Sequence, residues 1–126
     1  MIFFILTIFY NADCQKLAKF AVVINKKDMS VLLEFAMFPT DKTESVSIYV
    51  SRIIKYLDNS GTKYQLTSMG TIVETETLEE ALEIIKESYY LLEKDCNRVY
   101  SSFKIDIRKN LDNRMQQKID SVREKI

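Results

Sequence analysis

Side chains that could bind a polar small molecule are concentrated in two stretches of this chain. The first is residues 64–74, YQLTSMGTIVE, and the second is residues 98–108, RVYSSFKIDIR. Apolar and polar residues alternate in the second stretch, so a strand there would bury one face and present polar groups on the other. That polar row is either a solvated surface or a place where something polar binds. The predicted buried row is Val99, Ser101, Phe103, Ile105 and Ile107, and the predicted polar row is Tyr100, Ser102, Lys104, Asp106 and Arg108.

The composition argues against several classes of function. The chain has 126 residues, with 18 basic and 18 acidic side chains and no histidine. A formal charge of zero argues against nucleic-acid or anionic-membrane binding, both of which gain from a basic excess. The lack of histidine removes the usual catalytic triads and the commonest zinc ligand. We therefore predict a protein that is not an enzyme and that has no metal site and no cofactor.

The two cysteines, Cys14 and Cys96, are isolated and form no CxxC pair or metal-like cluster. Two isolated thiols are more typical of a reducing compartment than of a disulfide framework, although a bond between them stays an alternative. We therefore expect a cytoplasmic protein in which Cys96 is chemically inert.

Residues 1–28 differ in character from the remainder of the chain. Their apolar run at 2–9, IFFILTIF, is too short to span a bilayer and lacks a basic segment before it. We interpret residues 1–28 as an extension outside the fold, arising from an upstream start, with an uncleaved anchor or signal as the alternative. Residues 29–126 are predicted to form one domain.

The order of predicted elements within residues 29–126 indicates the fold. Strands are predicted at 31–38, 64–67, 71–75 and 98–108. One helix is expected between an N-cap at Ser45 and a stop signal at 59–61, and another after a cap at Thr75 or Thr77. A terminal helix carries a narrow apolar seam that suits packing on a neighbour. The predicted buried stripe of the second helix is Leu78, Ala81, Leu82, Ile85, Tyr89 and Leu92, and the terminal seam is Met115, Ile119, Val122 and Ile126.

This order predicts an α+β fold: a ferredoxin-like βαββαβ plait with a four-stranded antiparallel sheet and an extra C-terminal helix. Both crossover helices should lie on one side of the sheet. The other side, which carries Phe38, Tyr100 and the polar row, is expected to remain uncovered and to meet water, a ligand or another subunit.

Residues 29–126 resemble the thiamine-binding proteins, a family of small ferredoxin-like proteins that was long uncharacterised. The family often has proline where Ser68 stands and an acidic residue where Ile107 stands, which implies a less rigid turn and one fewer possible ligand contact in this chain. The matching pieces are Glu34 with Pro39, Ser45-Val46-Ser47 with Tyr49-Val50, Tyr64-Gln65-Leu66-Thr67, Met69-Gly70-Thr71 with Glu74, Arg98-Val99-Tyr100, and Lys104-Ile105-Asp106 with Arg108.

The resemblance implies a cytosolic homo-oligomer, commonly a tetramer built as a dimer of dimers. It also implies that the protein binds thiamine or its pyrimidine portion at a subunit interface without converting it. Such a ligand requires a carboxylate near its cation, a stacking surface, and hydroxyl groups at its aminopyrimidine edge. The ligand-binding residues predicted on this basis are Glu34, Ser45, Ser47, Tyr49, Thr67, Met69, Gly70, Thr71, Glu74, Lys104 and Asp106.

Each predicted site residue also has a purely structural interpretation. Glu34 could contact a ligand or form an ion pair with Lys104 across the sheet. For Lys104, Asp106 and Arg108, a salt-bridge network is favoured over a ligand site. Gly70 is expected to serve backbone geometry and close packing, and Ser45 and Ser47 would most simply cap and solvate a helix.

Three other functions remain as alternatives to ligand binding. One is an enzyme of thiamine-related metabolism that uses a carboxylate–lysine pair such as Glu34 with Lys104. Another is single-stranded RNA binding on the uncovered sheet face, which the zero net charge and the missing glycine-aromatic signature disfavour. The last is a structural or regulatory oligomeric module.

Overall fold

The computed structural model describes residues 29–43 and 45–126, so the interpretation of residues 1–28 lies outside the described residues. The elements run in the order strand, helix, strand, strand, helix, strand, helix. Their bounds are β1 Met29–Pro39, α2 Ser47–Ser60, β2 Lys63–Leu66, β3 Thr71–Thr75, α3 Leu78–Glu93, β4 Val99–Lys109 and α4 Arg114–Arg123.

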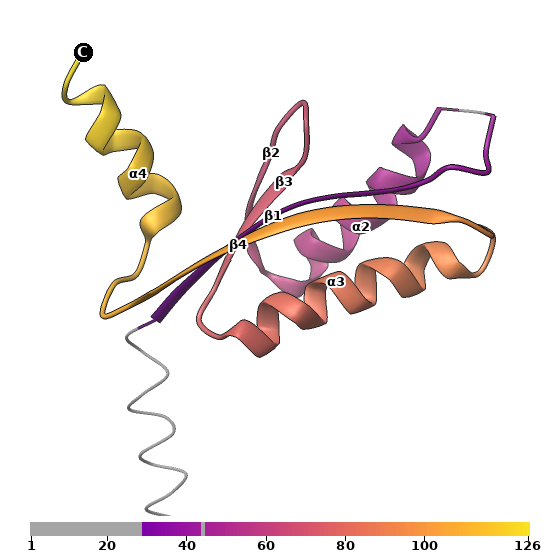
Figure 1. The fold of residues 1–126 in the computed structure, drawn as a ribbon, viewed down its shortest axis with the longest axis horizontal. Coiled ribbons are helices and arrows are strands. Elements are labelled where there is room, and N and C mark those ends of the chain that lie inside the picture. Colours follow the sequence, from indigo (N-terminus) through magenta and orange to yellow (C-terminus); the bar gives the residue numbers. More distant parts are fainter. Residues whose placement is uncertain (1–28, 44) are drawn as a thin grey trace, which may run out of the picture.

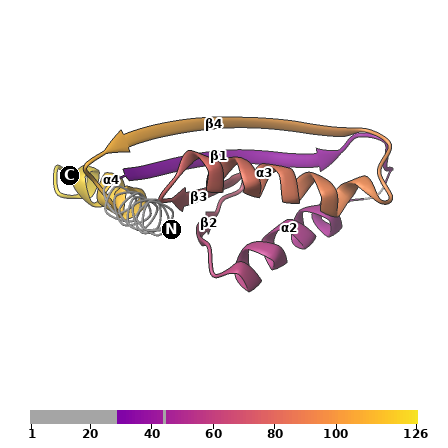
Figure 2. The ribbon, with the colours of Figure 1, turned by 90° about the horizontal axis from the view of Figure 1, so that it is seen from below.

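The four strands form one sheet in the order β2-β3-β1-β4, and every neighbouring pair is antiparallel. Helices α2 and α3 lie on the same side of this sheet, and α4 lies beyond one end of it (Figures 1 and 2). This arrangement confirms the predicted ferredoxin-like plait with an added C-terminal helix.

The hydrophobic core lies between β1, β3 and the two crossover helices. Alternate residues of β1 point toward the helices and are almost fully buried, as the period of two requires. Helices α2 and α3 contribute residues at spacings of three and four to the same core. The core includes Val31, Leu33, Phe35, Met37, Ile53, Leu57, Val73, Ala81, Ile84 and Leu92.

The helix ends confirm two of the predicted local signals and correct the third. Gly61 ends α2 in the left-handed conformation, with φ of 68°. The Thr77 hydroxyl accepts a hydrogen bond from the Glu80 N–H at 3.2 Å and caps α3. The N-cap of α2 was predicted at Ser45 but lies one residue later. Val46 occupies the cap position without a side-chain hydrogen bond, and Ser45 Oγ accepts from the Ser47 N–H at 3.3 Å.

The buried stripe of α3 is rotated relative to the prediction. Leu82 and Tyr89 were expected inside but are 45% and 42% exposed. Ile84 and Ser88 are buried in their place, because the core contacts the line of residues 81, 84, 88 and 92. The prediction followed the large apolar side chains of the helix. It therefore left out Ser88, which carries a hydroxyl but is buried.

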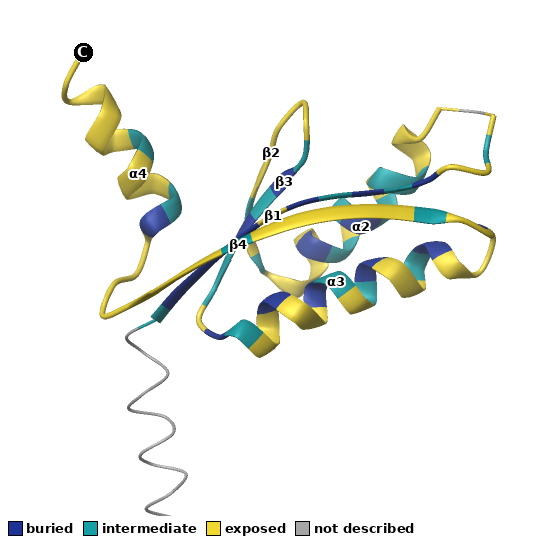
Figure 3. Ribbon diagram, in the orientation of Figure 1, coloured by how far each residue is buried: buried dark blue, intermediate teal, exposed yellow. Residues whose placement is uncertain are grey.

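Strand β4 is less buried than its alternating pattern predicted (Figure 3). Phe103 and Ile107 occupy the side of the sheet that faces the helices, yet they are 49% and 45% exposed. The reason is that β4 is an edge strand, so nothing beyond it supports a helix over its outer half. Ile105 and Val99 are partly buried, as expected.

We call the face of the sheet opposite α2 and α3 the open face. It was predicted to be uncovered, but one end of it is covered. At the end where β1 begins, the start of α4 lies over it, and Ser30 and Leu32 on that face are only 1% and 8% exposed. The remainder of α4 projects away from the sheet (Figure 1). Val122 and Ile126 of its apolar seam are therefore exposed.

Candidate functional site

A small hollow lies between the last residues of β1, the first turns of α2 and the turn that joins β2 to β3. We call it the hairpin hollow; it has a volume of about 250 Å³. The predicted site residues Thr67, Met69, Gly70 and Thr71 line it together with apolar side chains. Those apolar side chains, which the prediction did not include, are chiefly Phe38, Val46, Val50, Ile53 and Leu66.

The turn that borders the hairpin hollow is held by its own hydrogen bonds. The Thr67 N–H donates to the Gly70 carbonyl at 2.9 Å, and the Gly70 N–H donates to Thr67 Oγ1 at 3.1 Å. A Cβ on Gly70 would lie 2.9 Å from the Phe35 carbonyl oxygen, which is closer than real Cβ atoms approach. The close-packing interpretation of Gly70 is thus confirmed. Glycine lets the turn lie directly against β1.

A second hollow lies on the open face, and we call it the sheet hollow. It has a volume of about 270 Å³ and is lined by Glu34, Ser102 and Lys104, among others. It shares Phe35, Ala36 and Met69 with the hairpin hollow, so the two are neighbours. The Met69 side chain borders both of them and is 85% exposed.

Glu34 and Lys104 form the ion pair that was one of the two interpretations of Glu34. They are direct partners in the β1–β4 ladder, and Lys104 Nζ lies 3.2 Å from Glu34 Oε2. The Glu34 side chain is 47% exposed and that of Lys104 is 82% exposed. A pair so open to solvent is weak, and either partner can exchange it for water or another ion.

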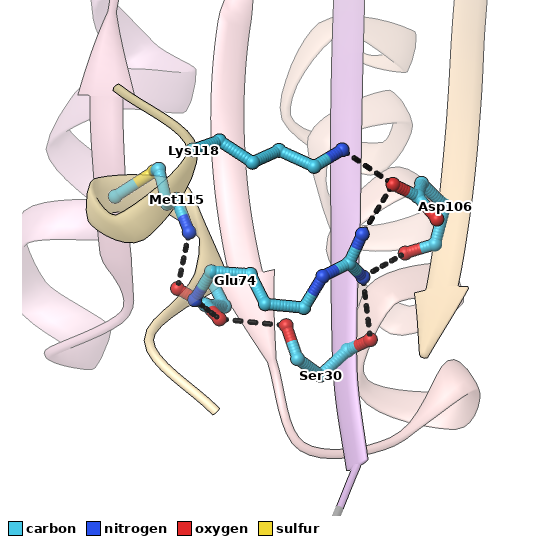
Figure 4. Close-up of polar contacts among 6 residues, drawn as sticks. Ser30, Glu74, Asp106, Met115 and Lys118 are labelled. Carbon is cyan, nitrogen blue, oxygen red and sulfur yellow. Dashed lines mark hydrogen bonds and ion pairs between the residues drawn. The ribbon is translucent and has the colours of Figure 1, made fainter. Parts of the chain in front are cut away.

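Glu74, one of the predicted ligand-binding residues, holds the start of α4 (Figure 4). Its carboxylate is only 7% exposed and accepts hydrogen bonds from Ser30 Oγ at 2.6 Å and from the Arg114 and Met115 N–H groups at 2.7 and 3.2 Å. Burial alone would raise the pKa of Glu74. The hydroxyl and the two N–H donors outweigh burial, with help from Lys63 at 3.5 Å, and lower that pKa.

Asp106 also anchors α4. It accepts hydrogen bonds from Lys118 Nζ at 2.6 Å and from the Arg114 guanidinium, and these two cations lower its pKa. Arg114 is 4% exposed and also donates to the main-chain carbonyls of Ser30 and Asp106. We call Ser30, Glu74, Asp106, Arg114 and Lys118 the α4 anchor. The salt-bridge interpretation of Asp106 is confirmed within the chain.

The three predicted residues near the start of α2 remain outside both hollows. Ser45 and Ser47 are exposed and their hydroxyls lie 2.8 Å apart. Tyr49 packs against the core and lies under the Arg52 guanidinium, which is 4.9 Å from the ring centroid. Arg52 in turn binds Asp95 on the α3 side through two hydrogen bonds, at 2.7 and 2.8 Å. These contacts connect the two helices.

The part of the chain that the structure describes contains no helix long and apolar enough to cross a membrane. Nor do histidine, cysteine and acidic side chains gather there in a group of three or more that could hold a metal ion.

A family model described as thiamine-binding protein matches residues 33–123. This chain belongs to that family. A UPF0045 protein of Methanothermobacter thermautotrophicus is 36% identical to it over 83 residues, which cover 65% of this chain and 84% of that protein. UPF0045 protein MJ1052 of Methanocaldococcus jannaschii is 35% identical over 94 residues, which cover 75% of this chain and 93% of that protein.

Solved structures have the same fold as this member of the thiamine-binding protein family. The crystal structure of hypothetical protein MJ1052 from Methanocaldococcus jannaschii matches with a TM-score of 0.67 at 35% identity, covering 75% of this chain and 97% of that one. A candidate thiamine biosynthesis/salvage protein from Thermotoga maritima matches with a TM-score of 0.54 at 21% identity, covering 69% and 94% of the two chains.

The predicted site of this family member therefore divides into three groups. Glu34, Lys104 and the residues of the 67–71 turn surround the two neighbouring hollows. Glu74 and Asp106 belong to the α4 anchor, and Ser45, Ser47 and Tyr49 lie at the start of α2. The predicted ligand-binding residues did not include Ala36, or Ser102 of the polar row, although the β1–β4 register pairs these two directly, next to the pair of Glu34 and Lys104. Sequence reasoning also missed Arg114, for which no local pattern signals burial.

Proposed function

We propose that this protein binds thiamine or a related pyrimidine or thiazolium metabolite in the hairpin and sheet hollows, without converting it chemically. The observation that carries the proposal is the match of residues 33–123 to a family described as thiamine-binding. The location is supported by the adjacency of the two hollows, which together bring apolar side chains, hydroxyl groups and one open carboxylate to the same place.

The hairpin hollow suits the aminopyrimidine ring. Its volume of about 250 Å³ is below the range of drug-sized pockets, so it fits one ring and its substituents rather than a larger molecule. Phe38 and Val50 supply apolar surface, and Thr71 supplies a hydroxyl for the polar edge of the ring. The Thr67 hydroxyl already donates to the Gly70 carbonyl at 2.8 Å and keeps the turn in place beside the ring. Met69, at the border of the two hollows, brings a thioether that packs well against aromatic rings.

The sheet hollow suits the cationic part of such a ligand. Glu34 lies there with a half-exposed carboxylate. The other acidic groups on this face, Glu74 and Asp106, are already hydrogen-bonded in the α4 anchor. Glu34 is therefore the carboxylate that we expect to lie near a thiazolium ring.

The same proposal includes a second copy of the chain over the open face. Met69 and Tyr100 are 85% and 54% exposed, and Phe38 contacts Tyr100 with ring centroids 5.5 Å apart. A partner sheet would cover these aromatic and thioether groups and close the ligand from solvent. We accordingly propose a homo-oligomer, a dimer of dimers, which light scattering of the purified protein would measure. A cytoplasmic location fits the two isolated cysteines.

The test is calorimetric titration of the full chain with thiamine and with its hydroxymethyl aminopyrimidine. Thr71→Val keeps the shape of a 5% exposed side chain and removes its hydroxyl. It should weaken binding about threefold to tenfold, the usual cost of one neutral hydrogen bond. Thr43→Val, in the exposed loop before α2, is the matched control and should leave affinity unchanged. Absence of both heat and thermal stabilisation at millimolar ligand would reject the function.

The non-catalytic part of the proposal has its own test. The protein should be incubated with thiamine and with its phosphates at concentrations that saturate the site. Mass analysis of the ligands should then recover them unchanged. Steady product formation that disappears in Glu34→Gln would favour the carboxylate–lysine enzyme instead.

A further inference from the structure

Lys104 already binds the carboxylate that a cationic ligand would need as its charge partner. Its ammonium is 3.2 Å from Glu34, the open carboxylate of the sheet hollow, and both side chains line that hollow. The pair has no net charge, so a cation that enters the hollow gains little from Glu34 while Lys104 remains beside it.

On the described open face, no other acidic group is available to pair with Lys104 in place of Glu34. Asp106 is two residues along β4 from Lys104, about 7 Å away by strand geometry. It is already hydrogen-bonded to Lys118 and Arg114 in the α4 anchor. Glu74 lies in the same cross-strand row as Asp106 and is bound by the start of α4. Competition for Glu34 is thus between Lys104 and the ligand.

The exposure of the two partners shows that this competition is reversible. In the single chain the Lys104 side chain is 82% exposed and has one ion-pair partner among the described contacts, so breaking the pair costs little. A neutral aminopyrimidine placed in the hairpin hollow, as proposed above, would leave this ion pair intact. An intact thiamine, which carries a cationic thiazolium, must displace it.

We propose that Lys104 sets the charge selectivity of the site by holding Glu34 and opposing a cationic ligand. This inference rests on the proposed function and adds the residue that discriminates between thiamine and its neutral pyrimidine. Lys104 acts on the ligand through Glu34 and through its own charge, and it is a specificity-determining residue rather than a catalytic one.

The experiment compares four forms of the full chain: wild type, Lys104→Gln, Glu34→Gln and the double variant. The net charge of the pair is zero in the wild type, minus one in Lys104→Gln, plus one in Glu34→Gln and zero in the double variant. Thiamine affinity should therefore rise about two- to fivefold in Lys104→Gln and fall by a similar factor in Glu34→Gln, the range expected for exposed charge pairs. The double variant should return close to the wild type.

The neutral hydroxymethyl aminopyrimidine provides the internal comparison, and its affinity should remain within about twofold in all four forms. The thiamine differences should shrink in 0.5 M salt, at which the Debye length falls to about 4 Å. Lys86→Gln on α3 removes the same charge from the opposite side of the sheet and should not change the ratio of the two affinities.

The two proposals fail in different ways. If the wild type binds neither compound, the proposed function is wrong. If both bind but Lys104→Gln leaves the ratio of thiamine to pyrimidine affinity unchanged, the function stands and the selectivity role of Lys104 is wrong. All four forms should be compared by circular dichroism and thermal unfolding, and the exposure of both side chains predicts that they fold alike.

Discussion

Replacing Glu74 by glutamine should detach α4 from the sheet. The wild-type carboxylate accepts three hydrogen bonds within 3.2 Å, two of them from the first N–H groups of α4, and lies 3.5 Å from Lys63. Glutamine keeps one acceptor oxygen but brings an NH₂ group toward donors that it cannot satisfy. The side chain is 7% exposed, so water cannot easily take over these contacts.

The expected loss follows from the kinds of contact removed. A lost helix cap costs about 0.5–2 kcal/mol, and a hydrogen bond to a charged group is worth about 1.5–3 kcal/mol. The two figures describe overlapping contacts and do not add. We expect the free energy of unfolding to fall by about 2 kcal/mol at pH 7. With a denaturant slope typical of small domains, the urea midpoint should fall by about 1 M.

The same substitution should change the dependence of stability on pH. Glu74 has a lowered pKa in the folded protein, so its stabilisation is fully present above the pKa of the unfolded chain, about 4.3. That stabilisation is lost as pH falls through the folded pKa. The stability gap between wild type and Glu74→Gln should therefore be largest at neutral pH and should close below about pH 4.

Urea titration and amide hydrogen exchange together test this reasoning. Exchange should accelerate in residues 114–123 more than in β1, because the lost contacts are local to α4. Glu93→Gln, an exposed change at the end of α3, is the control and should lie within about 0.5 kcal/mol of wild type. Unchanged stability and unchanged protection of α4 in Glu74→Gln would refute the anchoring role.

Further substitutions test single contacts in the fold, each by urea unfolding. Gly70→Ala should cost about 1–3 kcal/mol, because its Cβ would meet the Phe35 carbonyl at 2.9 Å. Gly61→Ala should cost about 1–2 kcal/mol, since φ of 68° is unfavourable for alanine, although nothing crowds its Cβ. If Gly61→Ala were as stable as the wild type, backbone strain at this position would be excluded. Ser88→Ala should be neutral or stabilising by up to about 1 kcal/mol, because the buried Ser88 hydroxyl has no hydrogen-bond partner among the described residues. A clear loss in Ser88→Ala would reveal a partner.

The features that could be predicted from sequence are those that depend on nearby residues. The strand at 71–75, the stop at Gly61 and the cap at Thr77 each follow from turn chemistry or periodicity within a few positions. The antiparallel plait follows from the order of the elements. Burial of β4 was overestimated, because an alternating pattern does not reveal whether a strand lies at the centre or the edge of a sheet.

The candidate site was harder to predict because it depends on contacts between distant segments. Glu34, Glu74 and Asp106 were all included among the predicted ligand-binding residues, whereas Glu74 and Asp106 flank Leu32 in one cross-strand row and bind the start of α4. Arg114 follows the last strand and becomes buried only through its contacts with two strands. No residue pattern near Arg114 in the sequence predicts its burial. The pairing of Glu34 with Lys104 was one of the two interpretations that the sequence left open for Glu34.

The unbroken β1–β4 ladder restricts how this chain can change in length. Its 11 residues in each strand pair one to one, from Met29 with Lys109 to Pro39 with Val99. Deleting a single residue within β4 would reverse the facing of every later side chain in that strand. A deletion just before Lys104 would turn Lys104 and Asp106 toward α3 and abolish both the Glu34 pair and the α4 anchor together. Insertions and deletions should consequently be excluded from these two strands and confined to the connections between elements.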